Sequence, residues 1–414
     1  MRISILHYAA PPIVGGVEST IYHHARLLAQ AGYQVSIIAG RGESFNTQIP
    51  FIHVPEIDSR HPQVIEVGQA LANGKVDQEF IGLRDKLYQE LISNLDSSDV
   101  LIVHNVITLH KNLALTAALK LISERGKPLI LAWCHDFAWQ DKLYTPDLHP
   151  GYPWDLLKTP WPGIRYITVS DHRRQRLAEL LDIPDSTIEV IPPGIDVFQF
   201  LDISPFTQEI VNRLQLLEAD PLVLLPARIT RRKNIEFGIQ VIKSLINIYP
   251  DVSLVVTGPP GPHNPKNIIY LNSLRTLKEE LQVESNVHFL YEINGEDQVL
   301  KIPDEIVADL YRLADIIIFP SHREGFGIPV LEAGLARTPI FAADIPSVRE
   351  SSTGLINLFN PNGDPQTVAS DIHIFLKSDR AYQLRKQVLN RFTWQSILKK
   401  RIIPILDELG PPKK

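Results

Sequence analysis

The sequence predicts an α/β protein with two domains, each a doubly wound parallel sheet covered by helices. Short uncharged runs, rich in β-branched residues, alternate with longer segments of helical period along the chain. Such runs are typical of strands buried on both faces, as in parallel sheets with helices on either side. The alternation stops at Ile191-Pro192-Pro193-Gly194 and then restarts. A chain of 414 residues is also too long for one ordinary core.

The first series of elements begins with the apolar run 2–7. Further strands are predicted at 34–39, 50–54, 99–104, 128–134, 164–169 and 188–191. Amphipathic helices are predicted between them, at 17–31, 77–95, 110–125 and 171–182. The segment 137–162 is rich in aromatic residues and proline, and we interpret it as an irregular active-site loop.

The second series has the same character. Strands are predicted at 222–227, 252–257, 286–290, 315–319 and 339–342, and helices at 233–248, 266–282, 303–313, 329–336 and 364–378. The last amphipathic stretch, 393–409, follows the final helix of this series. We therefore expect domains at 1–200 and 201–390, followed by a C-terminal segment, 391–414. Ligands of such sheets bind at the carboxyl ends of the strands, so we expect two domains that face each other across a cleft.

The composition is that of a folded globular protein, with 44% hydrophobic and 21% charged residues. A formal net charge of -6 argues against a general nucleic-acid-binding protein, which would carry a basic face or stripe. The local cluster Arg231-Arg232-Lys233 is compatible with binding one small anion.

The single cysteine, Cys134, allows no intrachain disulfide and fits a reducing compartment. No run of about 18 apolar residues is present, so we expect no membrane-spanning helix. The apolar start, Met1 to Leu6, is too short for the core of a signal peptide. These features predict a cytoplasmic protein, and contact with a membrane surface stays compatible with them.

The most informative stretch runs from Pro320 to Ala333. An apolar strand leads into a loop with two glycines, and Pro329 stands where a helix would begin. Glycines let the backbone approach a ligand closely, and the N–H groups of a helix N-terminus suit a diphosphate. Glu324 lies in this loop and Glu332 about one turn into the helix, where both could accept hydrogen bonds from ribose or hexose hydroxyls. The alternative is an exposed loop acid and a helix-stabilising charge, but the surrounding strand, glycines and proline favour a ligand site.

The pattern Glu-Gly-Phe-Gly-x-Pro-x-x-Glu-Ala, starting at Glu324, resembles the donor-site signature of the family-four retaining glycosyltransferases, also called glycosyl transferases group 1. That family has the GT-B fold of two Rossmann-like domains, and the likeness spans nearly the whole chain. The resemblance implies that Glu324 faces the transferred sugar and that Glu332 binds the nucleotide ribose. It also implies that Gly325, Phe326 and Gly327 contact the donor.

The resemblance assigns roles to whole segments as well. It implies that the first domain binds the acceptor, that the second binds a nucleotide sugar, and that segment 391–414 crosses back to the first domain. One departure is Arg337, where relatives commonly carry glycine, and this makes the helix C-cap there less certain.

Arg228 and Lys233 follow the first strand of the second series and resemble the family's Arg…Lys pair, which grips the donor diphosphate. Such cations can neutralise the charge that grows on the leaving phosphate, so we count both as catalytic. The alternative is a pair of solvated charges at a helix start. Unpaired cations are unfavourable at a helix N-terminus, and a bound anion would explain them better.

Two further glycine turns match the family. Gly15 and Gly16 join the first strand to its helix and resemble a glycine loop whose amides approach the donor or the acceptor. Gly258 ends a strand in a turn that resembles the one below the nucleotide base. Each is a weak signal alone. The first loop lacks G-x-G-x-x-G, which counts against an NAD-binding fingerprint.

His135 and Asp136 follow a strand end in the first domain. By resemblance, His135 lies near the transferred sugar and is counted as catalytic, whereas a lone histidine is otherwise more often a packed residue. Asp136 is expected either to orient the imidazole or to contact the acceptor. His104 and Asn105 also stand at a strand end and are predicted acceptor contacts. We expect segments 58–80 and 137–162 to line the acceptor pocket.

Together these motifs predict transfer of a hexosyl group from a nucleoside-diphosphate sugar, of UDP-glucose or GDP-mannose type, to a hydroxyl with retained configuration. The acceptor would be a saccharide, a glycolipid or a small molecule, and the stereochemistry comes from the resemblance alone. The sequence has neither an Asp-x-Asp motif nor convincing metal-ligand spacing. We therefore expect no metal and no permanently bound cofactor.

Other functions fit parts of the pattern. A nucleotide-sugar epimerase would need no acceptor, and a glycosyl phosphorylase would need phosphate and often a pyridoxal lysine, which we do not find. A non-catalytic sugar-nucleotide-binding protein would need none of the catalytic groups. The presence of Arg228, Lys233, Glu324 and Glu332 argues against the last alternative.

Overall fold

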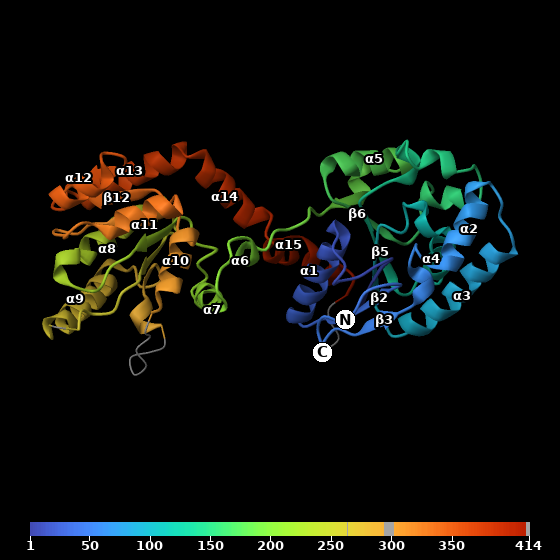
Figure 1. Cartoon of the computed structure of the whole chain (residues 1–414), viewed down its shortest axis with the longest axis horizontal. Coiled ribbons are helices and arrows are strands. Elements are labelled where there is room, and N and C mark those ends of the chain that lie inside the picture. Colours follow the sequence, from blue (N-terminus) through green and yellow to red (C-terminus); the bar gives the residue numbers. More distant parts are fainter. Residues whose placement is uncertain (263, 294–301, 411–414) are drawn as a thin grey trace. The chain divides into compact units, whose positions relative to one another are not determined.

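The computed structural model describes residues 1–262, 264–293 and 302–410. The chain forms two compact units (Figure 1). Unit 1 consists of Met1–Ile195 together with the chain from Phe392 onward, and unit 2 of Asp196–Arg391. The division falls a few residues before the boundary expected at 200/201. Asp196 caps helix α6 (Val197–Phe200), and Val197 and Phe198 pack in the core of unit 2.

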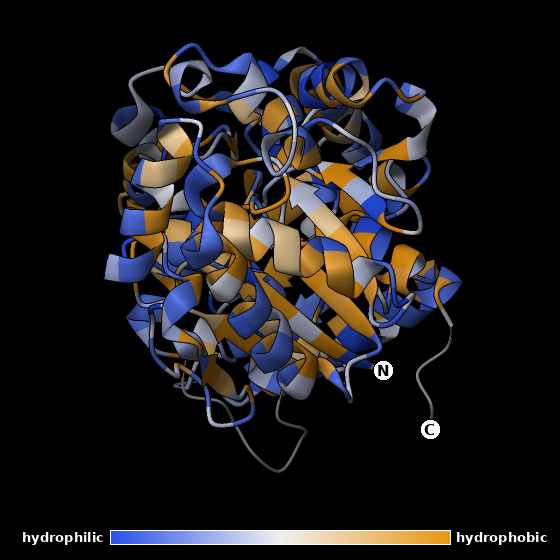
Figure 2. Cartoon of the chain, turned by 90° about the vertical axis from the view of Figure 1, so that its right-hand side faces the viewer, coloured by the Kyte–Doolittle hydropathy of each residue, from blue (hydrophilic) through white to orange (hydrophobic). Residues whose placement is uncertain are grey.

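Unit 1 contains a seven-stranded parallel sheet in the order β3-β2-β1-β4-β5-β6-β7. All seven strands lie where the sequence predicts them, and in Figure 2 their apolar residues show as orange arrows behind the helices. The order reverses between β1 and β4, which are neighbours. The strands are β1 Arg2–His7, β2 Gln34–Ala39, β3 Phe51–His53, β4 Val100–His104, β5 Leu129–Cys134, β6 Arg165–Thr168 and β7 Ile188–Val190.

The helices of unit 1 include one that was not predicted. Helix α2 begins with Pro62 and buries Val64, Val67 and Leu71 at helical spacing. The helical pattern of this segment is short and is interrupted by Gly68, so it does not stand out in the sequence. Segment 137–162 is irregular, as predicted, with three 3₁₀ turns, η3 Ala138–Gln140, η4 Thr145–Asp147 and η5 Trp154–Leu157. The helices are α1 Gly16–Gln30, α2 Pro62–Ala72, α3 Gln78–Leu95, α4 Leu113–Ser123 and α5 Asp171–Leu181.

The C-terminal segment packs on unit 1. Ile195 forms a parallel bridge with Thr393, and the ring of Trp394 stacks on His23 with centroids 4.9 Å apart. A Cβ on Gly194 would lie 2.5 Å from that indole, so only glycine fits at this position. The segment consists of α15 Trp394–Ile397, the π-helix η9 Leu398–Ile402 and α16 Ile403–Glu408, whose apolar residues join the core beneath β1 and α1.

Unit 2 contains a six-stranded parallel sheet in the order β10-β9-β8-β11-β12-β13. The sequence predicts five of these strands and misses β13, an edge strand of three residues. The order reverses between β8 and β11. The strands are β8 Leu222–Leu225, β9 Ser253–Val256, β10 Val287–Phe289, β11 Ile316–Phe319, β12 Ile340–Ala343 and β13 Asn357–Phe359.

The predicted helices of unit 2 are all present, and the described residues form four more, two before the predicted set and two within or after it. Helices α6, α7 (Pro205–Arg213), α12 (Pro346–Ser352) and α14 (Arg380–Arg391) were not predicted, because two are shorter than eight residues and α14 has a highly charged sequence. The predicted set is α8 Ile235–Ile246, α9 Lys266–Leu281, α10 Asp304–Leu313, α11 Ile328–Ala336 and α13 Pro365–Ser378.

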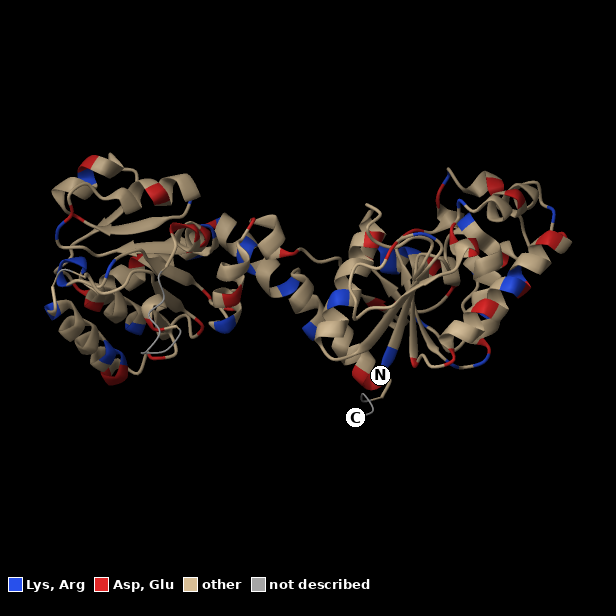
Figure 3. Cartoon of the chain, turned by 60° about the horizontal axis from the view of Figure 1, so that its bottom comes forward, with Lys and Arg blue, Asp and Glu red and all other residues tan. Residues whose placement is uncertain are grey.

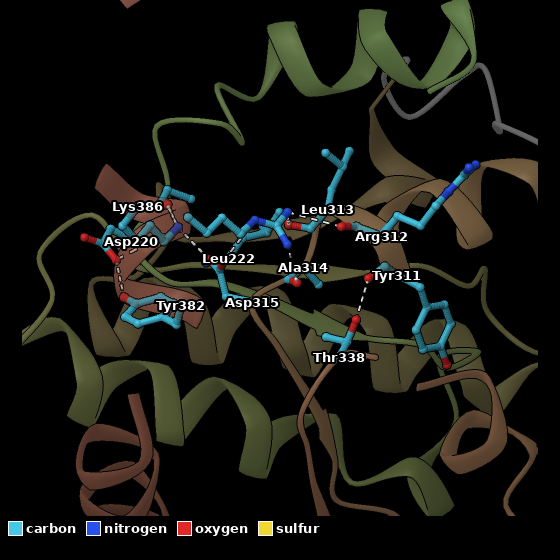
Figure 4. Close-up of polar contacts among 12 residues, drawn as sticks. Asp220, Leu222, Tyr311, Arg312, Leu313, Ala314, Asp315, Thr338, Tyr382 and Lys386 are labelled. Carbon is cyan, nitrogen blue, oxygen red and sulfur yellow. Dashed lines mark hydrogen bonds and ion pairs between the residues drawn. The ribbon is translucent and has the colours of Figure 1, made fainter. Parts of the chain in front are cut away.

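Buried polar contacts fix α14 to the amino ends of β8 and β11 (Figure 4). Lys386 lies 2.5 Å from Asp315 and donates a hydrogen bond of 2.6 Å to the carbonyl of Ala219. Asp315 also accepts from the amide of Leu222 at 2.7 Å and lies 3.6 Å from Arg385. Because the side chains of Lys386 and Asp315 are almost fully buried, loss of either one would leave a buried charge without its nearest partner, which is costly. The last helix before Phe392 is thus tied firmly to its own unit.

Charged residues lie mostly on the helices and loops of both units, with acidic and basic side chains interspersed, whereas the strands carry few (Figure 3). Across the described residues, every helix is either too short or too polar to cross a lipid bilayer.

Candidate functional site

The strand order of unit 2 places two loops next to each other at the carboxyl ends of β8 and β11. This is the point where the order reverses, and open α/β sheets bind ligands there. The loops are joined by the amide of His322, which donates to the carbonyl of Arg232 at 2.9 Å. Asn234, in the left-handed conformation with φ of 52°, donates its side-chain amide to the carbonyl of Pro320 at 3.1 Å. The two loops therefore form one surface.

A carboxylate on the second loop pairs with two cations on the first. Lys233 donates to one oxygen of Glu324 at 2.6 Å, and Arg232 donates to the other at 3.0 Å. The Glu324 side chain is only 8% exposed and that of Lys233 only 10%. Burial raises the pKa of Glu324, but the hydrogen bond and charge of Lys233 outweigh it and hold the pKa below its usual value. Burial lowers the pKa of the Lys233 ammonium despite the paired carboxylate.

The sequence predicts a bound anion from cations that would otherwise be unpaired at a helix start, and these ion pairs modify that inference. Lys233 lies in the 3₁₀ turn η7 (Arg231–Lys233), just before α8, and Glu324 already supplies it with a negative partner. Arg231 lies over the ring of Tyr270, 5.2 Å from its centroid. Within the described residues, only Arg228 among these cations has neither an ion pair nor a ring partner, and it is exposed. One carboxylate against these cations leaves an excess of positive charge at the strand ends.

Gly258 allows the loop after β9 to touch the loop after β8. A Cβ at this position would lie 2.5 Å from the carbonyl oxygen of Ala227 and 2.7 Å from the amide nitrogen of Arg228. Both obstacles are backbone atoms, so a side chain could be accommodated only if one loop moved. The requirement for glycine here therefore fixes the position of Arg228.

Replacement of Gly258 with alanine should lower both stability and nucleotide affinity. We expect a loss of about 1–3 kcal/mol in unfolding free energy, because backbone must shift to relieve the contact. The matched change Gly334→Ala adds a methyl group where no atom lies within 4 Å, on the exposed face of α11, and should be neutral or stabilising. Thermal unfolding and titration calorimetry with UDP and GDP measure both quantities. Equal behaviour of the two variants would contradict the packing argument.

The loop that carries Glu324 leads directly into the N-terminus of α11. Gly327 caps it with φ of 95°, and a Cβ there would lie 3.2 Å from the hydroxyl of Ser351. Pro329 is the second helical residue rather than the first. Among the described residues, none accepts a hydrogen bond from the backbone amides of 324–328. A helix N-terminus with such amides attracts an anion. Phe326 is 46% exposed beside it.

Glu332 is held from the opposite side by Tyr311, the residue near the end of α10. The phenol donates to the Glu332 carboxylate at 2.7 Å. The backbone carbonyl of Tyr311 accepts from Thr338 at 2.8 Å, as Figure 4 shows. Burial and then Glu332 raise the pKa of Tyr311, so the phenol remains a donor. Helix α11, which carries Glu332, ends at Arg337. This residue adopts the left-handed conformation usually taken by glycine, with φ of 58°. Sequence reasoning missed Tyr311, because nothing in its own segment links it to Glu332.

In unit 1 the reversal of strand order lies between β1 and β4. Gly15 caps α1 in an extended conformation, and a Cβ on it would lie 2.1 Å from a carboxylate oxygen of Glu18. The Glu18 side chain is therefore folded back over the glycine loop. Gly16 has no atom within 4 Å of its Cβ position. A role for these glycines with donor or acceptor remains a prediction.

Asn105 organises the loop after β5. Its side-chain oxygen accepts from the amides of His135 and Asp136 at 3.1 and 3.0 Å, and its amide group donates to the Asp136 carboxylate at 3.2 Å. Asp136 also pairs with Arg173 at 3.4 Å. The polar atoms of Asn105 are thus engaged in positioning its neighbours, so the structure favours a supporting role for it over direct contact with an acceptor.

Three buried histidines, His7, His24 and His104, lie behind this loop, and the half-buried His135 belongs to the loop itself. His104 is fully buried, so it lies beneath the surface expected to contact an acceptor. Its ring nitrogen is 3.5 Å from that of His135. Burial lowers the pKa of His135 to about 4, and Asp136 only partly offsets this. His135 is therefore a neutral imidazole near pH 7. No group of His, Cys, Asp and Glu within the described part of the chain could hold a metal ion.

Two family models match the chain. The model described as "Glycosyl transferases group 1" matches residues 206–391, and the model described as "Glycosyltransferase Family 4" matches residues 14–198. The chain belongs to these glycosyltransferases. Its two parallel-sheet units are the two α/β halves of the GT-B fold.

Characterised and uncharacterised relatives are distant from this glycosyltransferase. It is 24% identical to an uncharacterised glycosyltransferase of Methanocaldococcus jannaschii, over 63% of the chain and 64% of the relative. It is 24% identical to mannosylglucosylglycerate synthase of Petrotoga mobilis, over 84% and 83%. It is 27% identical to D-inositol 3-phosphate glycosyltransferase of Corynebacterium urealyticum, over 57% and 58%. The match thus spans less than two thirds of the first and third of these relatives.

Solved structures similar to this glycosyltransferase include two that match over nearly its whole length. A glycosyltransferase from Rickettsia africae is 18% identical with a TM-score of 0.37, over 100% of this chain and 99% of that one. A sucrose-phosphate synthase from Thermosynechococcus elongatus is 16% identical with a TM-score of 0.38, over 99% and 98%.

In this glycosyltransferase, the predicted donor residues gather at the carboxyl edge of the unit 2 sheet. Lys233 and Glu324 are in direct contact, Gly258 touches the backbone of Arg228, and the Gly325–Gly327 turn leads into α11 with Glu332. The predicted residues of unit 1 form a separate group at the carboxyl edge of their own sheet. Sequence reasoning also missed Arg232 as a partner of Glu324, since it was noted only as part of a basic cluster.

Proposed function

We propose that this glycosyltransferase moves a hexosyl group from a nucleoside-diphosphate sugar to a hydroxyl of an acceptor, with retained configuration and without a metal ion. One observation carries the proposal. The buried Lys233–Glu324 pair, with the exposed Arg232 on the second carboxylate oxygen, lies where the strand order reverses, beside amides that have no acceptor among the described residues. Cations and amides suit a diphosphate, and the carboxylates nearby suit sugar hydroxyls.

In the proposed donor complex, Arg228 and Lys233 contact the diphosphate and the amides near Gly327 bind its oxygens. Glu332 accepts from the ribose hydroxyls, in an orientation set by the phenol of Tyr311. Glu324 faces the transferred sugar and also holds the Lys233 ammonium in place. Fixed cations supply the charge neutralisation that other enzymes obtain from a divalent ion.

The chemical step breaks the bond between the anomeric carbon and the diphosphate oxygen and forms a bond to the acceptor oxygen on the same face. The diphosphate leaves with both bonding electrons, and the acceptor proton passes to it. Lys233 and Arg228 stabilise the charge that develops on the leaving group, and the rest of the site holds the two substrates in register. His135, neutral near pH 7, is proposed to hydrogen-bond a hydroxyl of the transferred sugar.

The function is tested by incubating the full chain with UDP-glucose or GDP-mannose, with and without cell extract, in the presence of EDTA. We expect one donor to release its nucleoside diphosphate and its sugar to appear in a product with the same anomeric configuration. Isomerised donor without acceptor would indicate an epimerase. Tight nucleotide binding with no turnover of any donor would indicate a binding protein.

Replacement of Glu332 with alanine should weaken binding of the free nucleotide by about tenfold or more, because a charge-assisted hydrogen bond to ribose is lost. Tyr311→Phe should give a smaller loss, since it releases the carboxylate without removing it. Glu350→Ala on the neighbouring helix α12 is the matched control, as this acid is exposed. Calorimetry with UDP and GDP decides the matter, and unchanged affinity in the Glu332 variant would remove the ribose assignment.

A further inference from the structure

A pocket of about 190 Å³ lies within unit 1, between helix α2 and the loops that follow β4 and β5. It belongs to the segments 58–80 and 137–162 that the sequence assigns to the acceptor. Its lining includes Val64, Gly68, His110, Lys111, Asp147 and Trp154.

The walls combine apolar and polar side chains. Val64, Val67 and Leu71 come from one face of α2, and Trp154 comes from η5. A dry cavity of about 150 Å³ holds one benzene molecule, so this volume suits one six-membered ring with its substituents. Long acyl chains would not fit within it. The pocket therefore favours a compact ring that carries polar groups.

Two polar atoms of the lining residues are buried and have no hydrogen-bond partner among the described residues. They are Nδ1 of His110, on η2 (His110–Asn112), and Nε1 of Trp154. Both atoms are closed off from solvent, so they lie behind the pocket surface, and the groups that a ligand can reach are the polar side chains of the rim. Burial lowers the pKa of His110, so near pH 7 its ring presents one donor and one acceptor nitrogen.

The rim carries charges of both signs. Asp147 lies 3.9 Å from Nε2 of His110 and is half-exposed, and Lys111 is exposed beside it. An acid and a base together suit hydroxyl groups better than a strongly charged ligand. The side chain of Asn112 is already engaged, since it donates to the carbonyl of Glu56 at 2.8 Å and caps α4. The Asn112 side chain therefore forms part of the pocket wall and does not contact the ligand.

The same loops connect the pocket to the candidate site. Thr108 donates its hydroxyl to the carbonyl of Asp136 at 2.7 Å, and the amide of Ala138 donates to the carbonyl of Thr108 at 2.9 Å. The segment after β4 thus contacts the His135–Asp136 loop and then, a few residues later, lines the pocket with His110. We propose that this pocket binds a single sugar or cyclitol ring of the acceptor. The proposal rests on the proposed glycosyl transfer for its role in the reaction.

Two exposed mid-helical glycines provide a matched pair of variants. Gly68 lines the pocket and Gly82 lies on α3 away from it, and an added Cβ at either meets no atom within 4 Å. Leucine at either position should raise stability slightly, because glycine is a poor helix former. Gly68→Leu places its side chain at the pocket wall, and Gly82→Leu does not. Neither residue belongs to the candidate catalytic groups.

Ligand-observed NMR on the full chain, with methyl α-D-glucopyranoside, methyl α-D-mannopyranoside and myo-inositol as separate probes, tests the proposal. We expect at least one probe to bind the unaltered chain and Gly82→Leu, and to bind Gly68→Leu about tenfold or more weakly. Failure of all three probes to bind would overturn it, as would equal binding to both variants. Gly68-dependent binding of 4-nitrophenol but of no polyol would also overturn it, in favour of an apolar ligand.

The same samples separate this inference from the proposed function. UDP and GDP are titrated into the unaltered chain and both variants, and nucleotide affinity should be equal in all three. If the polyol binds in a Gly68-dependent way but the chain neither binds a nucleotide nor turns over a donor, the pocket proposal stands and the proposed glycosyl transfer is refuted. If the chain transfers sugar and the acceptor KM is unchanged in Gly68→Leu, the proposed glycosyl transfer stands and the pocket proposal is refuted.

Discussion

Replacement of Lys233 with methionine should lower the turnover of the donor sugar at least tenfold. Single preorganised groups that stabilise developing negative charge contribute about 10²–10³ in kcat, so the loss should approach that range. Methionine keeps much of the length and apolar surface of the lysine stem but removes the ammonium that lies 2.6 Å from Glu324. Since Arg232 still bonds to Glu324, the carboxylate is not left wholly unpaired and the fold should persist.

Lys243→Met, in the last turn of α8, is the matched control, because it removes a cation from the adjoining helix without touching the pair. Thermal unfolding checks that both variants are folded, and steady-state kinetics with saturating donor reports kcat. If the Lys233 variant turned over at near-normal rate, the ammonium could have no part in stabilising the leaving diphosphate.

Acidification from pH 7 to pH 5 should destabilise unit 1 strongly. Burial lowers the pKa of His7 and His135 to about 4 and that of His24 to about 3, against 6.5 in the unfolded chain. Between these values the unfolded chain binds more protons than the folded one, so stability is present above pH 6.5 and falls with pH below it. Each such histidine should lower the free energy of unfolding by about 2 kcal/mol at pH 5, because the contribution changes by about 1.4 kcal/mol per pH unit.

His24→Phe isolates one contribution. Both ring nitrogens of His24 are buried without a hydrogen-bond partner among the described residues, and its ring packs against Trp133 with centroids 4.6 Å apart. Phenylalanine keeps this packing and cannot be protonated. The melting temperature of this variant should therefore fall less than that of the unaltered chain between pH 6.5 and 5. His172→Phe, at an exposed position, should follow the unaltered chain. Parallel pH profiles for all three proteins would contradict the account.

The regular elements were largely predictable because burial on both faces leaves uncharged β-branched runs that stand out in the sequence. Strands β4 and β5 at the centre of the unit 1 sheet follow this rule. Helix α2 was not predicted, because Gly68 interrupts its apolar pattern, and the short edge strand β13 was not predicted either. Arg337 shows a different limit, since an arginine takes the left-handed cap position that the sequence rule assigns to glycine.

The candidate site was predictable where one segment carries both the residue and its context. Glu324, with its glycine turn and following helix, is such a case. The pairing of Glu324 with Arg232 and Lys233 was not predictable, because it depends on β8 and β11 being neighbours in space. Tyr311 was likewise found only through its hydrogen bond to Glu332. Asn105 was predicted as an acceptor contact, and only its bonds to the His135 loop show its supporting role.

A crystal of the full chain grown with UDP or GDP tests the central claim most directly. The account predicts diphosphate oxygens within hydrogen-bond distance of Lys233, Arg228 and the amides at the start of α11, with ribose hydroxyls on Glu332. A nucleotide bound elsewhere would contradict it, and so would a filled site in which Lys233 and Glu332 contact only their present protein partners.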